Sequence, residues 1–125
     1  MVASLSMPRA TTSLESSGVR DLDRTRRFLT LGVDIGGTNI KASVLDRSGG
    51  LISEWARLAT PSPATPAAVL QSIDALAAQL PQFERSSVGF PGVVKGGTVI
   101  TAPSLGTRHW SGFKLIDALA GRFGV

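Results

Sequence analysis

The segment GVDIGGTNIK, from Gly32 to Lys41, constrains the fold of this chain more than any other. Two strand-like apolar runs, FLTLGVDI and NIKASVLD, are separated only by Gly-Gly-Thr, and a third run, LISEWARL, follows after DRSGG. A parallel crossover needs about a dozen residues or more, so connections this short force neighbouring strands to pair antiparallel. The sequence therefore predicts that the folded region opens with a three-stranded antiparallel meander.

A helix is predicted after the segment TPSPATP, because its prolines cannot pair inside a sheet. Thr65 suits the N-cap, Pro66 suits the first helical position, and Pro81 marks the end. Its apolar stripe consists of Val69, Ile73, Leu76, Ala77 and Leu80. Further on, SSVGFPG and GTVITA predict two strands, and SGFKLIDALAG predicts a short helix with Ser111 as cap and Gly121 as stop. The expected order is β-β-β-α-β-β-α, a mixed α/β layer without the βαβα alternation of a Rossmann domain.

Composition indicates one folded unit. The chain has 125 residues with 42% hydrophobic content, enough for one core and too few for two ordinary domains. Residues 1–28 are rich in Ser, Thr and Arg and predict a flexible N-terminal extension, so the folded lobe is expected over residues 29–125. The absence of cysteine excludes disulfides and thiolate metal sites, and indicates a reducing, cytoplasmic compartment. No apolar run approaches the roughly 20 residues that span a bilayer, so we expect neither membrane insertion nor export.

The positive charge does not indicate a nucleic-acid partner. Half of the net charge of +4 falls in residues 1–30 and half in the remaining chain. Neither part is a basic block, and aromatic residues do not interleave with the arginines. We therefore expect no nucleic-acid binding.

The Gly-Gly-Thr connection carries the clearest functional pattern. Gly36 and Gly37 can adopt positive φ and leave amide N–H groups uncovered for an anion. Thr38 adds a hydroxyl donor, and Lys41 adds a positive charge on the strand that leaves the turn. Asp34 shares the pleat face of Gly36 at the strand end, where a carboxylate can hold a hydrated Mg²⁺ beside phosphate oxygens. These residue types together predict a site for phosphoryl transfer.

Other interpretations of this turn remain open. It could be a plain hairpin whose glycines only satisfy the turn, with Asp34 capping the turn and Lys41 solvated. A Walker loop and a dinucleotide-binding loop are excluded, because neither spacing of glycines is present.

Several other residues are not assigned to a site. His109 is the only histidine and lacks a carboxylate or serine partner in a recognisable motif, so a structural role is expected. Trp55 and the phenylalanines are expected in the core. The basic residues Lys95, Arg108 and Lys114 stay unassigned.

The segment GVDIGGTNIKASVLD resembles the first phosphate motif, Asp-x-Gly-Gly-Thr, of sugar kinases of the ROK family in the actin-like ATPase superfamily. VGFPGVV and VITAPSLGTRHWSGFKLIDAL resemble the continuing N-terminal lobe, in family order, so the likeness covers about residues 30–125. Within the family it is nearest to glucokinases, including polyphosphate-dependent ones. The resemblance implies a ribonuclease H-like lobe whose glycine hairpin grips ATP or polyphosphate, while the Pro-Gly loop borders a hexose, expected to be glucose.

The resemblance also implies roles for single residues. Asp34 would organise Mg²⁺ through water, Gly92 would offer backbone to the sugar, and Ser104 occupies a sugar-site position where family members usually have Asn. The residues expected at the donor phosphates are Gly36, Gly37, Thr38, Asn39 and Lys41.

The family's catalytic Asp, in an Asn-Asp-Ala segment, would follow Val125. No catalytic residue is therefore assigned in this chain, and no useful kinase activity is expected from it alone. A lobe that packs against a second half exposes apolar surface, so a homo-oligomer is a possible state. Two further classes stay open: a truncated or degenerate ligand-binding or interaction module, and a remnant of a ROK-type transcriptional regulator, for which about 28 residues leave too little room for a helix-turn-helix.

Overall fold

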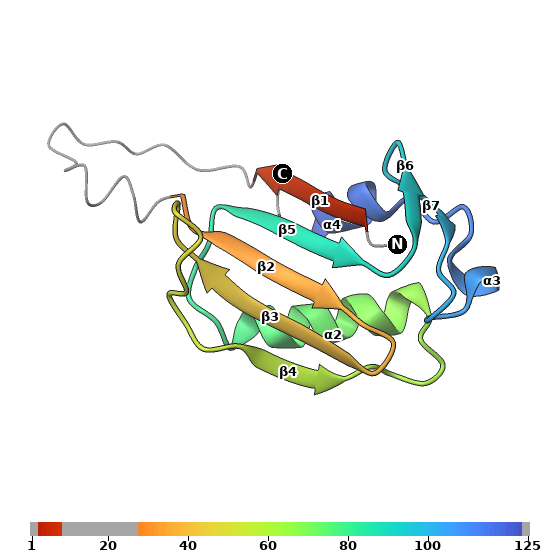
Figure 1. The fold of residues 1–125 in the computed structure, drawn as a ribbon, viewed down its shortest axis with the longest axis horizontal. Coiled ribbons are helices and arrows are strands. Elements are labelled where there is room, and N and C mark those ends of the chain that lie inside the picture. The colour runs from red at the N-terminus through yellow and green to blue at the C-terminus, as the bar shows by residue number, and fades with distance from the viewer. Residues whose placement is uncertain (1–2, 9–27, 124–125) are drawn as a thin grey trace, which may run out of the picture.

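The computed structural model describes residues 3–8, as backbone only, and residues 28–123 (Figure 1). The strands are β1 (Ala3–Pro8), β2 (Thr30–Ile35), β3 (Asn39–Leu45), β4 (Ala56–Ala59), β5 (Arg85–Phe90), β6 (Val93–Lys95) and β7 (Thr98–Thr101). The helices are α2 (Pro66–Ala78), α3 (Thr107–Trp110) and α4 (Leu115–Phe123). None of the helices within these ranges is long and apolar enough to cross a membrane.

A mixed five-stranded sheet forms the centre of the fold, with the order β1-β5-β2-β3-β4. β2 pairs antiparallel with β3, and β3 with β4, so the predicted meander is confirmed. β5 returns beside β2 in the parallel direction, and β1 pairs antiparallel with β5 at the edge. A separate two-stranded sheet joins β6 and β7.

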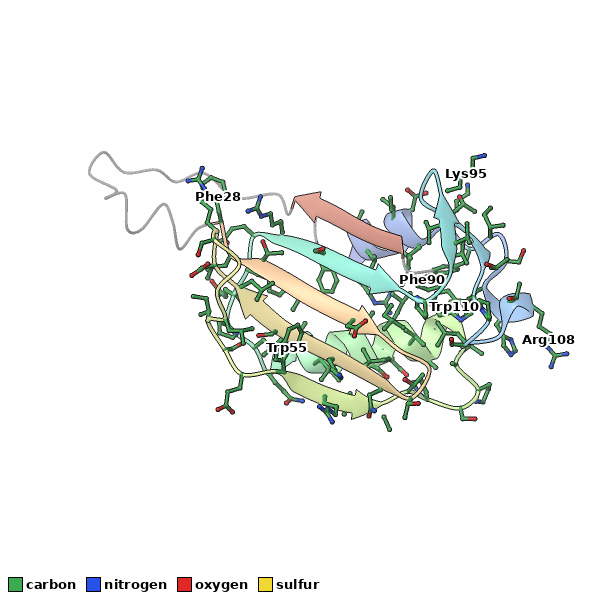
Figure 2. All side chains as sticks on the ribbon, in the orientation of Figure 1. Phe28, Trp55, Phe90, Lys95, Arg108 and Trp110 are labelled. Carbon is green, nitrogen blue, oxygen red and sulfur yellow. The ribbon has the colours of Figure 1, made fainter. Side chains whose placement is uncertain are left out.

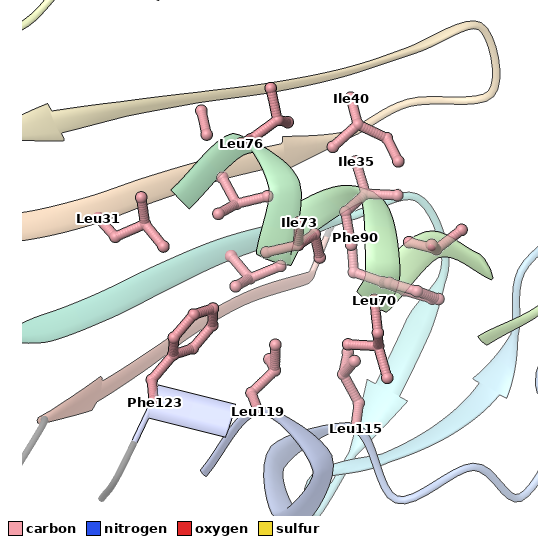
Figure 3. Close-up of a cluster of buried hydrophobic side chains, with 14 of the residues drawn as sticks. Leu31, Ile35, Ile40, Leu70, Ile73, Leu76, Phe90, Leu115, Leu119 and Phe123 are labelled. Carbon is pink, nitrogen blue, oxygen red and sulfur yellow. The ribbon is translucent and has the colours of Figure 1, made fainter. Parts of the chain in front are cut away.

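The hydrophobic core lies between this sheet and two helices. Near the hairpin tip the burial of β2 and β3 alternates, so that Val33 and Ile40 are buried while Asp34 is exposed. In Figure 1, α2 and α4 both lie behind the sheet. Their apolar side chains join those of β2, β3 and β5 in one buried cluster (Figure 3). The helical members of this cluster that Figure 3 labels are Leu70, Ile73 and Leu76 from α2 and Leu115, Leu119 and Phe123 from α4.

The central helix follows the sequence closely. Thr65 caps α2 by accepting a hydrogen bond from the Ala68 amide at 3.3 Å, and Pro66 occupies the first helical position, as predicted. The helix ends at Ala78, slightly before the expected end at Pro81.

The third strand is shorter than the LISEWARL run predicts, because it begins only at Ala56. Ser53 Oγ accepts a hydrogen bond from the Val44 amide at 3.2 Å, and the Ser43 hydroxyl lies 2.8 Å from the Ser53 carbonyl. Main-chain pairing here is limited to an isolated bridge between Leu45 and Leu51 and a bond from the Ile52 amide to the Val44 carbonyl, and the side-chain bonds interrupt the regular ladder, as short polar side chains often do.

The last helix was predicted with the wrong boundaries. Ser111 is the C-cap of α3 rather than the N-cap of the next helix, which begins at Leu115. Gly121 lies inside α4, which continues to Phe123 because the Phe123 ring packs edge-on against Phe83 at 5.5 Å. Tertiary packing therefore overrides the stop signal of the glycine.

The observed element order differs from the predicted one by three additions, β1, β6 and α3. The first of these lies in the expected flexible extension: residues 3–8 form a strand paired with β5. Residues 9–27 of the expected extension lie outside the described residues.

Two aromatic side chains expected in the core are exposed instead. Trp55 is 48% exposed and Phe28 is 44% exposed (Figure 2). The Phe28 ring lies beneath the guanidinium carbons of Arg47 and Arg85, which are 5.1 and 5.9 Å from the ring centroid. The expectation failed because Trp55 precedes β4 and Phe28 precedes β2, so both residues lie outside the strands. The phenylalanines Phe83, Phe90 and Phe123 are buried as expected.

Candidate functional site

The tip of the β2–β3 hairpin consists of Gly36, Gly37 and Thr38. The Gly36 amide donates to the carbonyl of Asn39 at 2.9 Å, which closes the hairpin. Gly37 and Thr38 are exposed, and no hydrogen-bond partner for either amide is found among the described residues. Two main-chain N–H groups at the tip are therefore free to bind an anion.

The predicted reason for the two glycines is wrong. Positive φ occurs at five other glycines among the described residues, but not at Gly36 or Gly37. Close approach makes glycine necessary here. A Cβ on Gly36 would lie 2.8 Å from the Asn39 carbonyl oxygen, and one on Gly37 would lie 3.0 Å from the Ser104 Cβ.

Thr60, directly after β4, holds the hairpin tip with two hydrogen bonds. Its hydroxyl donates to the Gly36 carbonyl at 2.6 Å, and its amide donates to the Thr38 carbonyl at 2.9 Å. Sequence reasoning missed this residue. The available signal was weak: Pro61 disfavours helical backbone at the preceding Thr60 and so keeps it close to the strand direction.

Charged side chains line the sheet face opposite α2, just below the tip. Asp34 lies directly opposite Lys41 on the neighbouring strand, and Lys41 lies directly opposite Arg57. Asp34 and Arg57 are exposed, and Lys41 is half-buried. Like charges directly opposite each other destabilise a sheet, so an anion bound beside Lys41 and Arg57 would relieve their repulsion further than Asp34, on the other side of Lys41, does alone. Arg57 was missed, although its alternation with Ala56 and Leu58 predicts that it faces away from the core.

Asp34 is compatible with a hydrated magnesium ion but not with a protein-only metal cage. No group of three or more His, Cys, Asp or Glu side chains that could hold a metal occurs in the described ranges. Mg²⁺ commonly keeps several waters and takes only one or two carboxylates besides phosphate oxygens. A single exposed carboxylate beside free amides fits that mode of binding.

The structure brings one predicted sugar residue to the hairpin. Ser104 is exposed, and its Cβ lies where a Cβ on Gly37 would meet it. The turn that carries Ser104 is fixed by hydrogen bonds from the Gly106 amide to the Ala102 carbonyl, at 2.9 Å, and from the Ala102 amide to the Thr107 hydroxyl, at 3.1 Å. Residues expected to meet the donor and the sugar therefore lie in contact.

Gly92, the other predicted sugar residue, is buried. Its amide donates to the Phe90 carbonyl at 2.9 Å, and a Cβ there would overlap the Thr101 carbonyl oxygen. The glycine is needed for this close chain crossing, and its amide is not available to a sugar.

Trp110 connects this end of the molecule to the core (Figure 2). Its fully buried ring packs against Phe90 at 5.0 Å, and its Nε1 donates to the Ala64 carbonyl at 2.7 Å. The proline-rich loop is thus anchored at Ala64 as well as at Thr60. His109, next to Trp110, is exposed and lies close to Gly106, and its side chain has no hydrogen-bond partner among the described residues.

The α/β fold with a mixed sheet is similar to that of ROK sugar kinases, which have the actin-like ATPase fold. A family model described as "ROK family" matches residues 30–125. The chain belongs to the ROK family, and the resemblance read from its motifs is confirmed.

Known proteins of this family align over most of the chain. A polyphosphate glucokinase of Mycobacterium leprae (strain TN) is 33% identical over 119 residues, covering 94% of this chain and 35% of that protein. A ROK family glucokinase from Streptomyces griseus, solved with glucose and AMPPNP, is 35% identical with a TM-score of 0.65, covering 75% of this chain and 30% of the other. An inorganic polyphosphate/ATP-glucomannokinase from Arthrobacter sp. strain KM is 30% identical with a TM-score of 0.65, covering 76% of this chain and 40% of that chain. The chain therefore spans about a third of the length of these relatives.

Proposed function

We propose that the complete protein transfers a phosphoryl group from ATP or polyphosphate to the 6-hydroxyl of a hexose, with glucose as the expected substrate. The described residues supply the donor-phosphate side of that reaction, in a lobe of the ribonuclease H-like type. The relatives support this proposal, since their names include glucokinase, polyphosphate glucokinase and polyphosphate/ATP-glucomannokinase.

The contact between Gly37 and Ser104 is the observation that carries the proposal. The free amides of Gly37 and Thr38 provide donors for phosphate oxygens, and Ser104 offers an exposed hydroxyl beside them. Phosphoryl transfer depends mainly on holding donor and acceptor in line and neutralising charge. The close approach of the proposed donor and acceptor sites supports the first requirement.

Charge beside the tip supports the second requirement. Lys41 would neutralise charge on the transferred group, with Arg57 beside it, and Asn39 would add a polar contact. Mg²⁺, held by Asp34 through water, would supply Lewis-acid neutralisation of the phosphate oxygens when bound. The described residues are not assigned a general base for the sugar hydroxyl.

Titration of the 125-residue chain with tripolyphosphate or ATP, each with MgCl₂, tests the donor site. In ¹H–¹⁵N spectra the amides of Gly37 and Thr38 should show the largest shifts, while those of Gly96 and Gly97 should stay in place. Small shifts scattered over the basic surface would contradict the proposal and favour a degenerate module.

Catalysis is tested on the complete protein, by following glucose 6-phosphate formation from ATP and from polyphosphate. Lys41→Ala should lower kcat more than it raises KM for the sugar, because Lys41 faces the donor. Ser104→Ala should act in the opposite sense, mainly on the KM for the sugar. Unchanged kinetics in both variants would contradict these assignments.

A further inference from the structure

We infer that Thr60 is a positioning residue for the donor phosphate, acting through the main chain of the hairpin tip; this inference rests on the proposed function. Thr60 lies outside the glycine motif, 22 residues after Thr38 in the chain. Its two hydrogen bonds bring it back to that motif from the end of β4.

The geometry of a trans peptide explains how Thr60 can orient the Gly37 amide without binding to it. The C=O and N–H of one planar peptide unit point in opposite directions. The Thr60 hydroxyl binds the Gly36 carbonyl, so the N–H of Gly37, in the same unit, points away from Thr60. The Thr60 amide binds the Thr38 carbonyl and directs the Asn39 N–H in the same manner.

Both glycines make this fixation necessary. Without a Cβ, the Gly36–Gly37 unit has more accessible backbone conformations than any other residue pair would have. The Gly36 amide is tied to Asn39, but its carbonyl has no partner other than Thr60 among the hydrogen bonds of the described residues. Loss of the hydroxyl would therefore release this peptide unit to rotate, and the Gly37 amide would no longer point in one direction.

Thr60 is itself held in place from both sides. β4 ends one residue before it, at Ala59, which pairs with Asn39. On the other side, Pro61 restricts the backbone of Thr60, and Trp110 anchors the loop at Ala64. The proline-rich loop therefore serves as a rigid support for the hairpin tip.

Thr60→Val tests the inference, because valine keeps the shape and removes only the hydroxyl. Affinity of the 125-residue chain for tripolyphosphate with MgCl₂ should fall about five- to tenfold, which is the size expected for one lost hydrogen bond that orients a charged contact. The shift of the Gly37 amide on titration should shrink with it. Thr60→Ser keeps the hydroxyl and should bind within about twofold of the natural chain.

Thr65→Val is the matched control. It removes another threonine hydroxyl that bonds to the main chain, at the cap of α2, and should lower the melting temperature without changing the affinity. Equal affinities of Thr60→Val and the natural chain would overturn the inference and leave the proposed function standing. Equal losses in Thr60→Val and Thr65→Val would overturn it as well, since stability alone would then explain them. A natural chain that binds no tripolyphosphate would overturn both.

Discussion

The sequence Gly-Gly-Thr occurs at two hairpin turns of this chain, and the two turns differ in structure. Between β6 and β7, Gly96 and Gly97 have φ of +59° and +80°, with Lys95 and Thr98 paired across the turn. Two positive φ values in a two-residue loop are typical of a type I′ hairpin turn. Between β2 and β3, neither Gly36 nor Gly37 has positive φ.

The difference shows that glycine serves different needs in the two turns. A Cβ on Gly96 would meet nothing within 4 Å, so only its backbone angle requires glycine, whereas Gly97 combines positive φ with a close approach, since a Cβ there would lie 3.0 Å from Ile116 Cδ1. Gly36 and Gly37 have ordinary angles but are crowded by Asn39 and Ser104. Positive φ is therefore the feature of residues 96–97, whereas Gly36 and Gly37 are packed on one side, and Gly37 and Thr38 are exposed on the other.

Gly36→Ala should have the largest effect. The new Cβ would lie 2.8 Å from the Asn39 carbonyl oxygen, so the main chain at the tip must move. We expect a loss of about 1–3 kcal/mol in the free energy of unfolding, as for an overpacked site. Affinity for tripolyphosphate should fall about tenfold or more, because displaced amides no longer converge on the anion. Urea denaturation and calorimetric titration measure the two quantities, and unchanged affinity would show that the tip is not the donor site.

Lys41→Ala, with Lys95→Ala as its matched control, should have the next largest effect. Each lysine lies near one of the two Gly-Gly-Thr turns. Of the two, only Lys41 has a second cation directly opposite on the neighbouring strand, Arg57, whereas Lys95 lies opposite Thr98. Lys41→Ala should weaken tripolyphosphate binding about five- to tenfold at low salt, and less at high salt. Lys95→Ala should stay within about twofold. Equal losses in the two variants would indicate nonspecific attraction by net positive charge.

Gly96→Ala should reduce stability only. Placing alanine at φ +59° costs about 1 kcal/mol, because the Cβ approaches the following carbonyl. Gly96→Asn should cost less, since Asn tolerates this region better. Both should bind tripolyphosphate like the natural chain. A larger loss of stability for Asn than for Ala would contradict the type I′ assignment.

The smallest effect is expected for Asp46→Ala, in the β3–β4 connection, where Asp46 binds the turn that contains a third glycine pair, Gly49 and Gly50. The pKa of the Asp46 carboxyl is lowered from its ordinary value of 3.8. The largest cause is the hydrogen bond from the Ser48 hydroxyl, and the next is the hydrogen bond from the Gly50 amide. A carboxyl with a lowered pKa stabilises the folded state above pH 3.8, and this contribution disappears as the pH falls through the folded-state pKa. Asp46→Ala should therefore lower the melting temperature slightly at neutral pH and not at about pH 2. An equal difference at both pH values would show that charge is not the cause.

The sequence predicted much of the fold where the signals are local. Short connections required antiparallel pairing of β2, β3 and β4, and Thr65 with Pro66 marked the start of α2. The signals failed where distant packing decided the outcome. Phe123 extended α4 past Gly121, and Ser53 side-chain bonds shortened the third strand.

The candidate site divides in the same way. Asp34, Thr38 and Lys41 could be named from their spacing around the glycines, because alternation along a strand fixes their faces. Thr60 and Arg57 could not, since each becomes part of the site only through the pairing of β4 with β3. The contact of Gly37 with Ser104 joins segments 67 residues apart, and no local pattern predicts such a contact.

The sequence by itself determined the opening meander, the central helix, the family and the glycine motif that we propose as the phosphate site. Only the tertiary structure decided why Gly36 and Gly37 must be glycines, which amides at the tip stay free, and which distant threonine holds them. The physical reason is range: propensity and alternation act over a few residues, whereas steric crowding and hydrogen-bond pairing depend on what the folded chain brings alongside.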